Sequence, residues 1–244
     1  MAELRNYQSQ VGGRADSAID EGLRAYMLKV YNLMAIALVV TGAVAYGAFN
    51  LAVQDGALTG FGQLLFTSPL RWVVMLAPLA FVFLFSFRID RMSVSSAQMT
   101  FWAFAAVMGL SLSSIFLVFT GQSIVRTFFI TAASFGALSL YGYTTKRDMT
   151  AMGSFLVMGV FGLILAMLVN LFLQSSALQF AISVIGVLIF AGLTAYDTQK
   201  IKESYYEAMD VAVAGRAAIM GALTLYLDFI NLFSFLLNFL GDRD

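Results

Sequence analysis

The sequence contains no histidine and no cysteine among its 244 residues. Zinc and copper sites normally use imidazole or thiolate ligands, so these sites are excluded, as are disulfides and thiol chemistry. A metal ion would have to be a hard cation bound through oxygen ligands. Histidine is the side chain that ordinarily titrates near neutral pH. A proton switch in this chain would therefore have to use carboxyl groups whose protonation is shifted by their surroundings.

Charged residues are scarce as well, at 11% of the chain, and they balance to a formal net charge of zero. This balance gives no reason to expect nucleic acid or an acidic substrate as a partner. Hydrophobic residues make up 60% of the chain, and the mean hydropathy is +0.84. Apolar runs longer than about 18 residues recur, as in helices that cross a lipid bilayer. The composition therefore predicts an all-α integral membrane protein with no room for a separate soluble domain.

The uncharged intervals between charged residues predict seven transmembrane helices. The second is short, because only sixteen residues separate Arg71 from Arg88. They form about 24 Å of helix, so both arginines are expected to reach toward the interfaces. A polar turn at residues 174–176 divides the longest interval into two spans. The seven spans are expected near residues 30–49, 72–87, 97–119 and 127–145, twice between 149 and 196, and at 217–240.

Lysine and arginine are distributed unevenly over the predicted loops. With the N-terminus inside, eleven lie in inner segments and three, Arg71, Arg126 and Arg243, in outer segments. The positive-inside rule then predicts an N-in and C-out topology. Residues 1–26, which lack the apolar core of a secretory signal peptide, would be a polar cytoplasmic tail, and residues 27–241 a seven-helix transmembrane domain. In a six-span alternative, the last segment lies on the surface or re-enters the membrane.

Asp228 lies near the middle of the last apolar stretch, with no other charged residue between Arg216 and Asp242. A carboxylate at the bilayer centre costs about 2.5 to 3.5 kcal/mol, so it usually faces protein or water and marks a function. Helical periodicity places other polar or small residues on its face. This stripe favours a position at the centre of the bundle, unless its amides and hydroxyls only bond neighbouring helices. The stripe contains Gly221, Thr224, Asn231, Ser234 and Asn238.

A second carboxylate, Asp197, lies at the end of the sixth predicted span. If that helix continues for a turn or two, as Gln199 permits, Asp197 can approach Asp228 on the neighbouring antiparallel helix. Two carboxylates in a partly dry pocket cannot both ionise cheaply, so one is expected to keep a proton and the pair to titrate as a unit. The alternative is that Asp197 only marks the membrane boundary, together with Lys200 and Lys202.

The segments AYDTQKIKE, around Asp197, and ALTLYLDFINLFSFLLNFLG, around Asp228, resemble the transmembrane Bax inhibitor motif family in its bacterial form. The resemblance extends over about residues 23–241. It implies a central C-terminal helix surrounded by six others, and a proton-sensitive calcium leak in the bacterial inner (plasma) membrane. It also implies that Asp197 and Asp228 form the pH sensor. Arg88, or less strongly Arg91, would pair with them as a latch that closes the path.

Calcium suits such a site, because hard cations take oxygen ligands and Asp197, Asp228 and Asn231 can supply them. So few strong ligands favour a permeant or weakly bound ion over a storage site. The sequence contains no phosphate-binding glycine-rich loop, nucleophile elbow or metalloprotease motif. We therefore expect neither an enzymatic activity nor a resident cofactor.

Two other functions remain open. Tyr196 and Asp197, followed by an aspartate on the next span, are similar to the layout of intramembrane aspartyl proteases. Residues 225–227 are Leu, Tyr and Leu, however, where those enzymes have Gly-x-Gly before the second aspartate. The family resemblance also implies a regulator of a membrane-bound protease, or of a cell-death or stress pathway, that acts through protein contacts. Such a partner would bind the charged N-terminal tail.

Overall fold

The computed structural model of the chain describes residues 2–206 and 209–243, with side chains from residue 21 onward. Seven helices in this part are long and apolar enough to cross a membrane. The prediction of seven spans is confirmed, and the last is a continuous helix of 30 residues. The helices are α1 (Ala2–Ala52), α3 (Leu70–Arg88), α4 (Val94–Leu112), α5 (Gly121–Thr144), α6 (Thr150–Leu173), α7 (Ser176–Glu203) and α8 (Val211–Leu240).

Short elements connect these helices. The α6–α7 connection is the expected polar turn, in which the Ser175 hydroxyl accepts a hydrogen bond from the Leu178 amide and caps α7. After α1 come a hairpin of β1 (Val53–Gln54) and β2 (Ala57–Leu58), the short helix α2 (Gly60–Gly62) and a π-helical turn (Gln63–Thr67). Turns of 3-10 helix at Ile89–Arg91 and Ser113–Leu117 extend α3 and α4.

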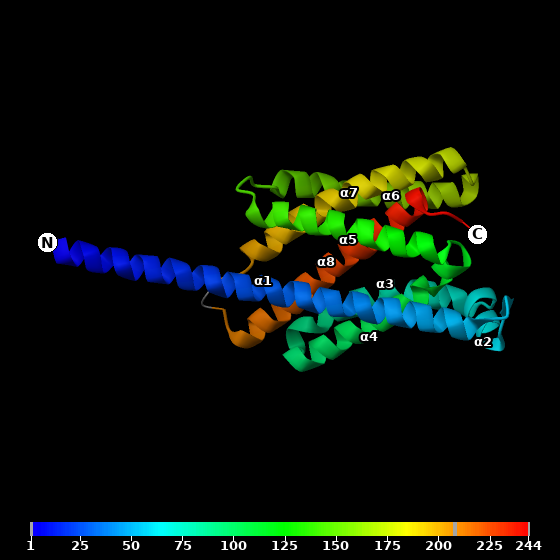
Figure 1. Ribbon diagram of the computed structural model, residues 1–244, viewed down its shortest axis with the longest axis horizontal. Helices are drawn as coiled ribbons and strands as arrows, with labels where there is room; N and C mark the ends of the chain where they lie inside the picture. Colours follow the sequence, from blue (N-terminus) through cyan, green and yellow to red (C-terminus); the bar gives the residue numbers. More distant parts are fainter. Residues whose placement is uncertain (1, 207–208, 244) are drawn as a thin grey trace.

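The C-terminal helix α8 runs diagonally between two groups of helices (Figure 1). The first group consists of α1, α3 and α4, and the second of α5, α6 and α7; α8 contacts members of both. The most apolar stretch of α8 is 67% buried, whereas that of α6 is 11% buried. The prediction of a central C-terminal helix surrounded by six others is confirmed. A polar stripe is costly in lipid, and this position keeps it within the protein.

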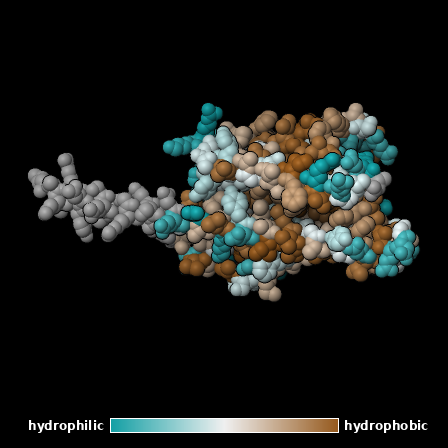
Figure 2. Space-filling model, viewed as in Figure 1, coloured by the Kyte–Doolittle hydropathy of each residue, from teal (hydrophilic) through white to brown (hydrophobic). Residues whose placement is uncertain are grey.

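The surface agrees with a membrane location. In Figure 2, hydrophobic side chains cover the middle of the visible face, and hydrophilic ones gather toward its two ends. We call the end where α1 projects the N-terminal end of the bundle, and the end where the chain terminates the C-terminal end. The N-in orientation remains a prediction from the distribution of lysine and arginine.

The helix α1 starts well before its membrane segment. It is one continuous helix of 51 residues, its first part projects beyond the bundle in Figure 1, and the candidate span begins at Glu21. The polar segment expected over residues 1–26 therefore forms, from Ala2 onward, the beginning of α1. The side chains of residues 1–20, which include most of the segment that a partner would bind, lie outside the described residues.

Tyr226 attaches α8 to the first group of helices. Its hydroxyl lies 2.6 Å from the Thr41 hydroxyl, which donates to the Ala105 carbonyl oxygen at 2.9 Å and therefore accepts from Tyr226. The fully buried Tyr226 ring meets the rings of Phe101 and Phe104 edge to face. These contacts fix the depth of α8 relative to α1 and α4.

In the second group, α5 and α7 approach each other unusually closely. A Cβ atom at Gly142 of α5 would collide with the Ala195 carbonyl oxygen of α7. Nearby, the Ser139 hydroxyl lies 3.0 Å from the Thr198 hydroxyl, which itself donates to the Thr194 carbonyl oxygen. The absence of a side chain at Gly142 thus allows α7 to pack directly against the backbone of α5.

Replacing Gly142 by valine should destabilise the protein. The new side chain has to push α5 and α7 apart, and overpacking of this kind costs about 1–3 kcal/mol. The matched control is Gly136→Val on the same helix, where a Cβ atom meets nothing within 4 Å. Thermal unfolding in detergent, followed by circular dichroism, should show a lower midpoint for Gly142→Val only. Equal midpoints for the two variants would contradict the close α5–α7 contact.

Candidate functional site

The carboxyl groups of Asp197 of α7 and Asp228 of α8 lie close enough to interact with each other. They meet because α7 continues beyond Asp197 as far as Glu203. The Asp228 side chain is 5% exposed, and its Oδ2 has no hydrogen-bond partner among the described residues. Carboxylate oxygens only accept hydrogen bonds, so a bond between two carboxyl groups requires a proton on one of them. Two carboxyl groups this close can therefore bond each other only when one of them holds a proton.

The half of α7 that carries Asp197 is fixed to the loop between α5 and α6. The buried Gln199 side chain accepts from the Met149 amide at 3.0 Å and donates to the Arg147 carbonyl oxygen at 2.8 Å. The Lys202 ammonium donates to the Tyr143 carbonyl oxygen at 2.8 Å. These bonds position Asp197 independently of α8. The sequence alone indicates only that Gln199 is compatible with a longer helix, because the loop residues that it binds are about 50 positions away.

The polar stripe of α8 does not bond neighbouring helices in the described part of the chain. Each of four side chains donates to a carbonyl oxygen of its own helix, four residues earlier. The bonds are Thr224 to Met220 at 3.1 Å, Asn231 to Leu227 at 2.8 Å, Ser234 to Ile230 at 2.7 Å and Asn238 to Ser234 at 2.9 Å. The alternative, in which the amides and hydroxyls of the stripe bond neighbouring helices, is therefore not supported.

A cavity of about 490 Å³ opens over this stripe, between α3, α4, α6 and α7. Asn231 and Ser234 belong to its lining, and Asn231 lies about one helical turn along α8 from Asp228. The cavity shares Met75 and Ser111 with a second one of about 460 Å³, which reaches Arg71 near the C-terminal end. Together the two cavities lead from the C-terminal end of the bundle toward the aspartate pair.

The structure does not bring the predicted latch to the pair. Arg88 and Arg91 are exposed at the end of α3 and in the turn that follows, because α3 packs mainly against α4. Among the described residues, the one ion pair joins Arg126 and Asp242. Lys200, three residues after Asp197 on the same helix, is the basic residue that lies nearest to it in sequence. The sequence alone predicts for Lys200 only a position at the membrane boundary.

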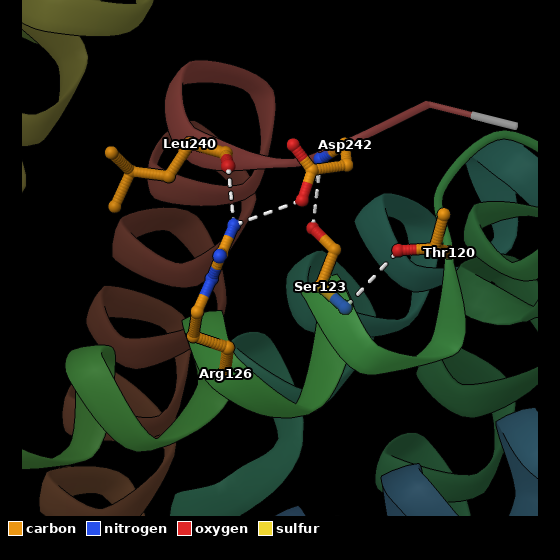
Figure 3. Close-up of polar contacts among 5 residues, drawn as sticks. All are labelled: Thr120, Ser123, Arg126, Leu240 and Asp242. Carbon is orange, nitrogen blue, oxygen red and sulfur yellow. Dashed lines mark hydrogen bonds and ion pairs between the residues drawn. The ribbon is translucent and has the colours of Figure 1, made fainter.

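A cluster of polar contacts holds the other end of α8 to the start of α5 (Figure 3). Arg126 donates to the Leu240 carbonyl oxygen at 3.2 Å and forms an ion pair with Asp242 at 3.1 Å. The Asp242 amide donates to the Ser123 hydroxyl at 2.9 Å. The ion pair is exposed and contributes little stability by itself. The sequence alone identifies Arg126 only as an outer charge, since no nearby residue indicates its partner.

The aspartate pair offers few ligands to a metal ion. Within the described ranges, no group of three acidic side chains comes together. Calcium usually takes 6–8 oxygen ligands, so Asp197 and Asp228 would have to be supplemented by water, by carbonyl oxygens or by the amide oxygen of Asn231. The arrangement therefore suits a weakly held or passing cation better than a resident one.

Known proteins are similar to this chain over almost its whole length. The family model described as inhibitor of apoptosis-promoting Bax1 matches residues 23–244. A protein of Rickettsia prowazekii is 51% identical over 230 residues, which cover 93% of this chain and 94% of that protein. The inner membrane protein YbhL of Escherichia coli is 45% identical over 235 residues, which cover 94% of this chain and 97% of YbhL. A membrane protein of Streptococcus pyogenes is 34% identical over 226 residues, which cover 92% of this chain and 96% of that protein.

Gln199→Leu should destabilise the protein, because it leaves the amide of the buried Met149 without a partner. An unsatisfied buried donor costs about 1–3 kcal/mol. The control is Gln122→Leu, which makes the same replacement at an exposed position at the start of α5. The unfolding midpoint in detergent should fall for Gln199→Leu and not for Gln122→Leu. A midpoint for Gln199→Leu equal to that of the wild type would show that these two bonds do not hold α7 in place.

Proposed function

We propose a pH-sensitive calcium leak as the function of this chain, which belongs to the Bax inhibitor-like membrane protein family. The chain is a multi-pass protein of the bacterial inner membrane, as its seven apolar helices and its likeness to YbhL indicate. The observation that carries the proposal is the contact between the carboxyl groups of Asp197 and Asp228.

The shared proton makes the pair sensitive to pH. While one carboxyl group holds a proton, the two can bond each other. Once that proton is lost, two negative charges about 4 Å apart repel by about 4 kcal/mol at an effective dielectric constant of about 20. The pair must then attract a cation or separate. Both responses change the contact between α7 and α8, so proton binding is coupled to the arrangement of the central helix.

The two connected cavities support a path for a hard cation. They lead past Ser111 to Asn231 and Ser234. Side-chain oxygens line this route without forming a complete coordination shell. Permeation requires binding that is strong enough for the ion to enter and weak enough for it to leave. A route that a few neutral oxygens line, and that leads toward two carboxyl groups, meets this requirement for calcium, which we treat as the transported ion.

We place the gate in α3. This helix forms one wall of the cavity over Asn231, and its most apolar stretch is only 17% buried. In the proposed closed state, the deprotonated pair attracts Arg88 and draws α3 inward over the path. The exposed Arg88 side chain fits the opposite state, in which the carboxyl groups share a proton and the latch is open. Acid should therefore favour the leak.

A second candidate function is the regulation of another membrane protein through direct contacts. The observation that favours it is the start of α1, which projects beyond the bundle (Figure 1). In this case residues 1–20 would be needed for function, whereas a leak through the bundle would not need them.

Asp197→Asn and Asp228→Asn should each abolish the pH dependence of calcium flux. Either exchange removes one partner of the shared proton. The protein is reconstituted in liposomes that contain a calcium dye, and flux is measured from about pH 8 to about pH 6. A one-proton switch changes flux by at most about tenfold per pH unit, so the wild type should become several-fold faster at acid pH. If both variants kept the pH-dependent calcium flux of the wild type, the paired sensor would be refuted.

Two controls belong to this experiment. Asp148→Asn removes a carboxyl group from the exposed α5–α6 loop, where hydrogen bonds from Thr150 lower the pKa of Asp148 below its ordinary value, so it does not titrate in this pH range. Its flux should keep the pH dependence of the wild type. A chain without residues 1–20 should also leak normally. Loss of flux in that truncated chain would favour regulation through the N-terminal segment over a leak.

Arg88→Gln should raise calcium flux at about pH 8, where the wild-type latch is closed. Loss of an attraction of about 1.4 kcal/mol shifts a closed–open equilibrium about tenfold. The matched variant is Arg91→Gln, which removes an equally exposed arginine from the next turn. It should have a smaller effect, and neither exchange should matter at acid pH. Equal flux of wild type and Arg88→Gln at pH 8 would remove Arg88 from the gate.

A further inference from the structure

The two groups of helices leave a furrow between α1 and α5. It consists of a cavity of about 550 Å³ toward the N-terminal end and one of about 350 Å³ toward the C-terminal end. The two cavities share Leu38 of α1, Phe128 of α5 and Phe229 of α8. Phe229 therefore belongs to the floor of the furrow, and its chain neighbour is Asp228.

The larger cavity is apolar along its length and cationic at one end. Its lining includes Arg24, Tyr31 and Tyr143 near the N-terminal end of the bundle. The Lys202 ammonium, which bonds the Tyr143 carbonyl oxygen, lies 5.4 Å from the centre of the Tyr143 ring. Tyrosine and basic side chains are typical of the headgroup level of a bilayer. Glu21 is exposed near this end and does not line the cavity.

The dimensions of this cavity match one leaflet of a membrane. The α1 residues in its lining run from Arg24 to Leu38, which is about 21 Å of helix. Half of a bilayer's hydrocarbon core is about 15 Å thick, so the cavity accommodates an acyl chain and reaches the headgroup level. On α5, the small residues Ala132 and Gly136 give it depth, and a Cβ atom at Gly136 meets nothing within 4 Å.

We propose that this furrow is a binding site for one anionic glycerophospholipid, whose phosphate lies at Arg24 and whose acyl chain lies between α1 and α5. The charge of Arg24 selects the anionic headgroup, and the apolar walls bind the acyl chain. Hydrogen-bond donors from Arg24 suit phosphate oxygens, because arginine recognises phosphate through its planar fork of N–H groups. This site is independent of the proposed leak, although its floor residue Phe229 lies next to Asp228.

The test is native mass spectrometry of the full chain in mild detergent, with equal amounts of phosphatidylglycerol and phosphatidylcholine. The wild type should retain one phosphatidylglycerol, with a preference of about tenfold over phosphatidylcholine. Gly136→Leu fills the open space on α5 and should reduce retention of both lipids about tenfold. Arg24→Gln should leave total retention largely intact and remove the preference for the anionic lipid.

The matched control is Gly47→Leu on α1, where a Cβ atom also meets nothing within 4 Å and which lies outside both cavities. It should retain lipid like the wild type. Equal retention in wild type and Gly136→Leu would overturn the site, and so would a wild type without preference for phosphatidylglycerol. A second copy of the chain bound in place of lipid, visible as a dimer that Gly136→Leu disrupts, would overturn it too. Arg24→Gln changes a surface residue, so it keeps the headgroup assignment testable even if Gly136→Leu folds poorly.

Discussion

The contact between Asp197 and Asp228 is the constraint on which the rest of the structure depends. Two carboxyl groups within a helical membrane bundle are tolerated only if they share a proton or attract a cation, because lipid offers them neither hydrogen bonds nor counter-charges. This requirement accounts for the central position of α8, which keeps Asp228 away from lipid. It also accounts for the length of α7, whose last turns carry Asp197 to the same depth.

The surrounding helices hold the two carboxyl groups in different ways. Asp197 belongs to a closely packed unit, in which Gly142 admits α7 against α5 and Gln199 bonds the α5–α6 loop. Asp228 lies on a helix that is attached to α1 and α4 through Tyr226. A change in the charge of the pair therefore acts between two units that meet along α8. Cavities lie on both sides of this boundary, one walled by α3 and the other between α1 and α5.

The sequence predicts much of this arrangement, because insertion into a bilayer makes every charge informative. The seven spans follow from uncharged intervals, and the central position of α8 follows from its polar stripe. The contact of Asp197 with Asp228 could be expected on the condition that α7 continues beyond Asp197. The bonds of Gln199 to the loop and of Arg126 to the C-terminus could not, because each joins residues far apart in sequence. The exposed position of Arg88 depends on how α3 packs, which local pattern does not determine.

Infrared difference spectroscopy of the protein in membranes can show whether Asp197 and Asp228 titrate as one unit. The carboxyl C=O stretch reports protonated carboxyl groups, and the absence of histidine simplifies the titration near neutral pH. We expect one protonated carboxyl signal in the wild type that either single exchange, Asp197→Asn or Asp228→Asn, removes or displaces. If the signals of the two single variants instead added up to that of the wild type, each aspartate would titrate alone and the two would share no proton.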